Sequence, residues 1–382
     1  FIRKNPQCVE FMQATVGVSI AHFQFATNWQ LKVDSPFNRR ITANTPMELS
    51  GPARGHDLLK THEDVTGTRA NGTFYNCAAG MTPWGTYLTA EEGVDDFFGN
   101  RRAASFTSSV EQAHNRFRPR GLESRFRWEF ADPRFNVALN PKEPFKFGWI
   151  VELDPQDALK PIKKRTALGR FKHEGATTVV APNGRVVVYM GDDQAFEYLY
   201  KFVTRDAMDP ENPESNVDLL DAGTLYVACF SEDGSGKWVP MVWGEHTALS
   251  LENGFGSQGD IVLRCREAAD LVGATPMDRP EDIAVSPRTN KVYLSCTRNS
   301  DRGEGEVEFA GRVVDSSANW ANPRTPNSWG HIVELSEYGA DASATEFRWE
   351  IFLLAGDPEV GQFLTMLDPG SLVSDSDSTY FA

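Results

Sequence analysis

The chain has 382 residues, of which 40% are hydrophobic, and it contains 22 Pro, 31 Gly and 25 Phe. This composition, without long helical runs of Ala, Leu, Glu and Lys, favours an all-β protein with many turns. The formal net charge of −15 argues against binding to a nucleic-acid backbone. Because no apolar stretch approaches the roughly 20 residues that cross a bilayer, we expect no membrane span.

The first 120 residues carry a mixture of strand and turn signals. Alternating residues around Gly17, followed by W-Q-L-K-V from Trp29, predict a first hairpin. Residues 37–56 hold so many turn residues that we expect a long connection there. The polar segment 91–119 is interpreted as an insertion with a short helix.

Three stretches share one layout. They are C-A-A-G-M-T-P-W-G-T-Y-L-T-A-E-E from Cys77, E-G-A-T-T-V-V-A-P-N-G-R-V-V-V-Y-M-G-D-D from Glu174, and E-D-I-A-V-S-P-R-T-N-K-V-Y-L-S-C-T-R-N-S from Glu281. Each begins with a metal-ligand type of residue, turns at a Pro-containing polar segment and returns as an alternating strand. A hairpin used three times predicts a β-propeller, with these hairpins innermost in successive blades. Cys77, Glu174 and Glu281 would then converge on one axis.

Other segments complete the predicted sheets. F-G-W-I-V-E-L-D-P from Phe147 and W-G-H-I-V-E-L-S-E from Trp329 resemble one another, which strengthens the propeller interpretation. Further strands are predicted from Ala195, Gly223 and Glu346, and the acidic, Pro-rich residues 209–221 predict an exposed loop. No segment is typical of a linker, so we expect residues 1–382 to form a single domain.

The first residues of the three hairpins are candidate metal ligands. A lone cysteine is usually a small buried hydrophobic residue, but Cys77 stands where the other hairpins have Glu174 and Glu281. A thiolate with carboxylates suits a redox-active transition metal beside hard cations such as Ca²⁺ or Fe³⁺. The five cysteines are scattered without C-x-x-C spacing, so they indicate neither a zinc site nor a disulfide framework.

The ends of the returning strands supply further acids. Glu91–Glu92 end the first hairpin, and Asp192–Asp193 occupy the corresponding place in the second. Because adjacent residues of a strand point to opposite faces, only one acid of each pair can face a shared site. We expect Glu92 to be the ligand and Glu91 to belong to an acidic turn.

Arg279 is the candidate for anion binding. It lies in D-R-P-E-D, two residues before Glu281, and a guanidinium can bind two oxygens of a tetrahedral oxyanion at once. The alternative is a surface salt bridge. Lys172 is a weaker candidate because its side chain is flexible, and His173 and His331 lack the spacing of metal-binding motifs and are expected to be structural. These residues predict a metal site but name no substrate.

Several segments resemble the PhoX-type alkaline phosphatases, in order from about Gly17 to Pro358. They are S-P-F-N-R-R-I-T-A-N-T-P, N-C-A-A-G-M-T-P-W-G-T-Y-L-T-A-E-E, A-L-G-R-F-K-H-E-G-A, V-Y-M-G-D-D-Q-A-F-E-Y-L-Y-K-F-V, G-A-T-P-M-D-R-P-E-D-I and N-P-R-T-P-N-S-W-G-H-I-V-E-L. The resemblance implies a six-bladed propeller whose axial site holds Fe³⁺ and Ca²⁺ and hydrolyses small phosphomonoesters. It implies that Cys77 binds iron, that Glu92, Glu174 and Glu281 bind iron or calcium, and that Arg279 holds the substrate phosphate.

The resemblance carries further expectations. Such a protein is exported by the twin-arginine route to the periplasm or the cell exterior, and we expect it to be a monomer. Ala90 and Gly93 stand where the family usually has Cys and Asn. The family continues past this C-terminus into another acidic hairpin and also has an N-terminal segment with an export signal, so we expect the chain to be truncated at both ends and its ring to be incomplete. The alternatives are a calcium-dependent propeller lactonase or phosphotriesterase, and a non-catalytic propeller that acts as a binding scaffold.

Overall fold

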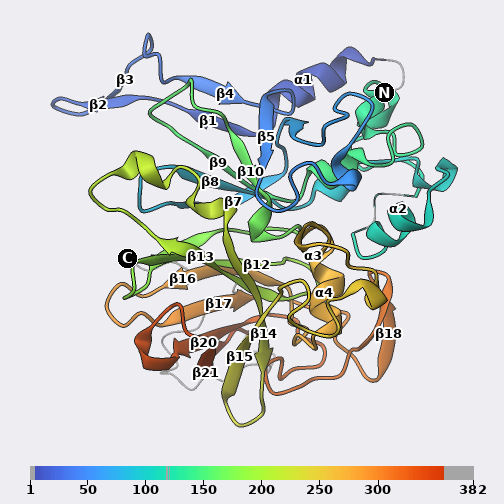
Figure 1. Ribbon diagram of the computed structural model, residues 1–382, viewed down its shortest axis with the longest axis vertical. Coiled ribbons are helices and arrows are strands. Elements are labelled where there is room, and N and C mark those ends of the chain that lie inside the picture. The colour runs from blue at the N-terminus through green and yellow to red at the C-terminus, as the bar shows by residue number, and fades with distance from the viewer. Residues whose placement is uncertain (1–4, 118, 120, 357–382) are drawn as a thin grey trace.

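The structure is a computed structural model that describes residues 5–117, 119 and 121–356, and it is mostly β (Figure 1). Two large sheets contain most of the strands. The first has the order β6-β5-β10-β9-β8-β7, and the second has the order β11-β12-β13-β14-β15-β21-β20-β17-β16. The predicted all-β class with short helices is confirmed, and the architecture is propeller-like.

The strands of the first sheet are β5 (Pro46–Ser50), β6 (Arg69–Asn71), β7 (Asn76–Met81), β8 (Tyr87–Glu91), β9 (Ile150–Leu153) and β10 (Lys163–Arg165). Those of the second are β11 (Thr177–Val180), β12 (Arg185–Gly191), β13 (Leu199–Ala207), β14 (Gly223–Phe230), β15 (Ser235–Pro240), β16 (Pro280–Val285), β17 (Val292–Cys296), β20 (His331–Glu337) and β21 (Glu346–Leu354). Smaller pairs join β1 (Val18–Ile20) to β4 (Arg39–Ile41), β2 (Phe23–Phe25) to β3 (Trp29–Leu31), and β18 (Glu306–Phe309) to β19 (Arg312–Asp315). The α-helices among the described residues are α1 (Gln7–Thr15), α2 (Ser108–Ala113), α3 (Gln258–Leu263) and α4 (Cys265–Leu271).

All three predicted repeat hairpins are present. They are the antiparallel pairs β7–β8, β11–β12 and β16–β17. Each turn ends in a residue with left-handed backbone, namely Gly85, Gly184 or Asn290. Glycine and asparagine adopt this conformation more readily than other residues. The sequence of each turn therefore specifies where its strand reverses.

The three hairpins meet along their first strands. β7 ends one large sheet, while β11 and β16 form the two ends of the other, and β11 contacts both β7 and β16. The end of β12 also approaches β16 closely, because a Cβ on Gly191 would lie 2.3 Å from the carbonyl oxygen of Glu281. The innermost strands thus converge as predicted. The number of blades stays a prediction. The single-domain organisation over residues 1–382 also stays a prediction, and the first and last residues of that range lie outside the described residues.

Strand β12 shows how the core divides between two faces. Val188 and Met190 belong to one buried apolar cluster, and Val187 and Tyr189 belong to another. This alternation follows from the two-residue period of a strand. Helices α3 and α4 contribute Ile261, Cys265, Ala268 and Ala269 to the first cluster. They therefore cover that face of the sheet.

Several predicted boundaries need correction. Residues 37–56 were expected to be irregular, but they contain β4 and β5. The strand predicted from Ala195 begins only at Leu199, because residues 192–198 form bridges and turns. Helices α1, α3 and α4 were not predicted. The hairpin β2–β3, the strands β9, β14, β20 and β21, and the short helix within 91–119 are confirmed.

Candidate metal centre

Five acidic or thiol side chains gather where the three hairpins meet, and we call them the axial cluster. They are Cys77, Glu92, Glu174, Asp193 and Glu281. One ligand atom from each of Cys77, Glu92 and Glu174 lies within 4.8 Å of the other two, and the same holds for Glu174, Asp193 and Glu281. Glu174 belongs to both groups. The structure therefore brings together all four predicted ligand residues and adds Asp193.

The repeated layout of the hairpins explains this convergence. Cys77 is the second residue of β7, Glu281 is the second residue of β16, and Glu174 lies three residues before β11. Glu92 follows the returning strand β8, and Asp193 lies two residues after the end of β12. Equivalent positions in successive hairpins thus supply equivalent side chains.

The paired acids at the strand ends divide between two environments, as the alternation of a strand predicts. Glu92 and Asp193 belong to the axial cluster. Asp192 is fully buried and pairs with Arg266, whose Nε lies 2.7 Å from Oδ2. Asp193 was not predicted to join the cluster, although its correspondence with Glu92 was visible in the sequence.

Glu91 corrects another expectation. It was assigned to an acidic turn, but its side chain is fully buried. Lys164 Nζ donates to Oε1 over 2.7 Å, and the backbone amides of Gly148 and Trp149 donate to Oε2 over 2.9 and 3.1 Å. A buried charge must be paired in this way to be tolerated. Glu91 therefore anchors the base of the first hairpin.

The axial cluster concentrates negative charge in a partly desolvated place. Burial, with the neighbouring Asp193 and Glu174, raises the pKa of Glu92 to about 8. Burial and Asp193 raise the pKa of Glu281 to about 10. Cys77 is exposed, but partial desolvation at the cluster and a hydrogen bond from its Sγ to Glu174 Oε1, 2.7 Å long, raise the pKa of its thiol. Acids held together against their mutual repulsion favour a bound cation.

Arg279 lies directly against this cluster. Its Nη2 is 2.8 Å from Asp193 Oδ2 and 2.8 Å from Glu281 Oε1. The side chain is 32% exposed, so it remains accessible from solvent. Its backbone has a φ of 48°, a region that residues other than glycine rarely adopt. The predicted neighbourhood of Arg279 and Glu281 is therefore present.

The donor set fits metal ions. Asp193 Oδ1 is buried, and within the described part of the chain no group donates a hydrogen bond to it. Carboxylate oxygens are the preferred ligands of Ca²⁺, and a thiolate is suited to a transition metal. Each of the two groups of three side chains could hold an ion.

The remaining candidates lie outside the cluster. Lys172 forms an ion pair with Asp95, 3.1 Å long. His173 and His331 are fully buried, and each Nε2 lies 2.9 Å from a backbone carbonyl oxygen. This is the structural role expected for both. None of the five cysteines forms a disulfide within the described part of the chain, and no helix in the described ranges is long and apolar enough to cross a membrane.

Fold and site together define the class of protein: a propeller-like β protein with thiol and carboxylate side chains of the kind that bind metals, and an arginine, where its innermost strands meet. The chain belongs to the PhoX alkaline phosphatase family, whose model matches residues 3–382. It is also similar to the solved structure of Pseudomonas fluorescens PhoX in complex with vanadate, a transition-state analogue. The sequences are 42% identical with a TM-score of 0.85, and the match covers 92% of this chain and 60% of the Pseudomonas chain. A search of curated proteins found no match.

Proposed function

We propose that the protein is a metal-dependent alkaline phosphatase that hydrolyses small phosphomonoesters. The observation that carries this proposal is the position of Arg279 beside two groups of metal-ligand side chains in a member of the PhoX family. The similar Pseudomonas protein binds vanadate, which mimics a phosphoryl group during transfer. An arginine next to cations is the arrangement that stabilises such a group.

We further propose distinct metals for the two groups of ligands. Cys77, Glu92 and Glu174 would hold Fe³⁺, because the thiolate is the soft ligand of the set. Glu174, Asp193 and Glu281 offer only oxygen ligands and would hold Ca²⁺. Bound cations would neutralise the charge of the phosphoryl oxygens and polarise the phosphorus–oxygen bonds.

The protein's own side chains would orient the substrate. The Arg279 guanidinium is 2.8 Å from two carboxylates of the cluster and has further N–H groups to present to phosphate oxygens. Thr297 Oγ1 donates to Glu281 Oε1 over 2.7 Å, which fixes the carboxylate that neighbours Arg279. The substrate phosphate and the Arg279 guanidinium would thereby be held in a fixed relative orientation, which lowers the entropic cost of the reaction.

The family resemblance also supports a cellular location and an oligomeric state for the enzyme. We propose that it acts as a monomer outside the cytoplasm, after export in a folded, metal-loaded form. Small phosphate esters would be its substrates.

An assay of purified protein tests the proposed reaction. We expect hydrolysis of an aryl phosphate that is lost after chelation and restored by adding iron with calcium. Activity restored by calcium alone, toward a lactone or a phosphotriester, would identify the alternative enzyme. Metal-loaded protein that hydrolyses none of these substrates would contradict a catalytic role.

A further inference from the structure

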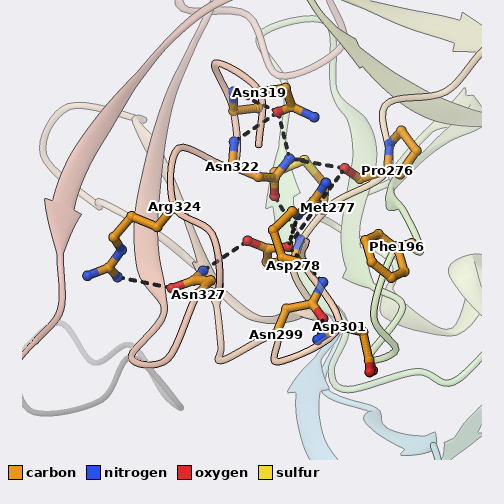
Figure 2. Close-up of polar contacts among 12 residues, drawn as sticks. Phe196, Pro276, Met277, Asp278, Asn299, Asp301, Asn319, Asn322, Arg324 and Asn327 are labelled. Atoms are coloured by element: carbon orange, nitrogen blue, oxygen red, sulfur yellow. Dashed lines mark hydrogen bonds and ion pairs between the residues drawn. The ribbon is translucent and has the colours of Figure 1, made fainter. Parts of the chain in front are cut away.

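Asp278, the residue before Arg279, accepts hydrogen bonds at both of its carboxylate oxygens. Asp278 is fully buried, and side chains from a distant part of the chain gather around it (Figure 2). Asn299 Nδ2 and Arg302 Nε each donate to Oδ1 over 2.8 Å, and Asn327 Nδ2 donates to Oδ2 over 2.9 Å. We call Asn299, Arg302, Asn322 and Asn327 the Asp278 cage.

The cage also holds the backbone. The amide of Asp278 donates to Asn322 Oδ1 over 2.8 Å, and Asn322 is held in turn by Asn319 Oδ1, 2.9 Å from its Nδ2. Asn299 and Asn327 are joined by backbone hydrogen bonds of 2.7 and 3.2 Å. All four cage residues are buried. The segment 299–327, which includes β18 and β19, thus surrounds Asp278 with a rigid set of donors.

Arg279 itself has an unfavourable backbone. Its φ of 48° is strained for an arginine and persists only where the surrounding structure enforces it. The cage fixes Asp278 on one side. On the other side, Thr297 donates its amide to the Arg279 carbonyl over 3.2 Å and its hydroxyl to Glu281 over 2.7 Å. The strained residue is therefore clamped from both sides.

We propose that Asp278 and its cage are a positioning device, which holds Arg279 in the left-handed conformation that directs its guanidinium toward Asp193, Glu281 and the substrate phosphate. Asp278 acts through Arg279 and does not touch the substrate. This inference rests on the proposed phosphatase function, because it assigns a means of orienting the arginine of that reaction. Without the charge of Asp278, the buried Arg302 loses the anion that it pairs with, and the cage loosens.

Asp278→Asn tests the proposal because it keeps the size of the side chain and removes its charge. We expect inhibition of the purified, metal-loaded enzyme by inorganic phosphate to weaken about tenfold, in line with coupling between neighbouring groups. The KM for an aryl phosphate should rise in parallel, while the iron and calcium contents stay at the parent level. Should Asp278→Asn not fold, Asn299→Ala removes one of the donors to Asp278, together with the acceptor of the Asp301 amide, and is expected to change phosphate inhibition in the same direction.

A double-mutant cycle separates positioning from stability. In an Arg279→Ala background, the effect of Asp278→Asn on phosphate inhibition should vanish, because the arginine that it orients is gone. Glu337→Gln is the matched control. Glu337 is also a buried acid, paired with Lys201 Nζ at 3.0 Å, but it lies outside the axial cluster. This control should lower the melting temperature and leave phosphate inhibition unchanged.

The possible results distinguish a failure of the positioning role from a failure of the proposed phosphatase function. If Arg279→Ala weakens phosphate binding but Asp278→Asn and Asn299→Ala do not, the positioning role is wrong and the proposed function stands. Equal effects of Asp278→Asn with and without Arg279 would also overturn the positioning role. If Arg279→Ala itself leaves phosphate inhibition unchanged, the proposed function fails, and this inference fails with it.

Discussion

Replacing Arg279 by alanine is expected to slow phosphate-ester hydrolysis without emptying the metal site. The guanidinium is not a metal ligand, so the iron and calcium contents should stay near those of the parent. Loss of one contact to transition-state charge typically costs about 2–4 kcal/mol. Because 32% of the Arg279 side chain is exposed, solvent screens its charge, and we expect the lower half of that range. A loss of about 2–3 kcal/mol corresponds to a decrease of about 30- to 150-fold in kcat/KM.

The assay is steady-state hydrolysis of an aryl phosphate, with elemental analysis of the same samples. Arg279→Lys serves as the control, since it keeps the charge but loses the planar fork that binds two oxygens. Its activity should fall between those of the parent and Arg279→Ala. If Arg279→Ala hydrolyses the ester as fast as the parent while retaining its metals, the reasoning about this residue is refuted.

Three further predictions concern the metal centre. Cys77→Ser should deplete iron before calcium, because a hydroxyl replaces a thiolate poorly at a transition metal; full iron content in this variant, by elemental analysis, would contradict the assignment. Glu281→Ala should lower calcium or iron content, since a carboxylate ligand is lost, and a content equal to that of the parent would count against its role. In chelated protein, the raised pKa values of Glu92 and Glu281, about 8 and about 10 against 4.5 for an ordinary glutamate, mean that the folded state binds more protons than the unfolded state. His114, His173 and His331 are neutral in the folded state because burial lowers their pKa to about 3, 3 and 4, and above about pH 7 they are neutral in the unfolded state as well. Melting temperature should therefore fall as pH rises from about 7 to about 8, and added calcium should reduce this fall; a melting temperature that rises over this interval would contradict the prediction.

The hairpins were predictable because local chemistry determines them. Each repeat turn carries a proline and ends in Gly or Asn, which specifies the reversal without help from the rest of the fold. The convergence of Cys77, Glu174 and Glu281 followed from their equivalent places in the repeat. Most of the axial cluster was therefore predictable from the sequence.

Other elements depend on tertiary contacts and were missed. Helices α3 and α4 are short, and they are separated at Arg264, whose φ and ψ are −117° and 37°. The sequence there therefore has no long stretch of hydrophobic residues at helical spacing. The start of α3 did carry a local signal, because the side chain of Ser257 accepts a hydrogen bond from the Asp260 amide, as an N-cap does. Arg266, in α4, is buried because it pairs with Asp192, a contact that no local pattern predicts.

The two acidic pairs show the same limit within the site. Alternation predicted that one member of each pair would face the cluster, and Glu92 does lie in it, while its role as a ligand stays a prediction. The partner of Glu91, Lys164, comes from a strand 73 residues further along the chain. Only the assembled sheet reveals that Glu91 is buried in an ion pair.

We propose above all that the axial cluster is a mixed-metal phosphatase centre. Elemental analysis of the purified protein, compared with its phosphomonoesterase activity, tests this most directly. We predict that the protein contains iron together with calcium, and that activity rises in proportion to the content of both metals across preparations. Active protein that contains neither iron nor calcium would contradict it.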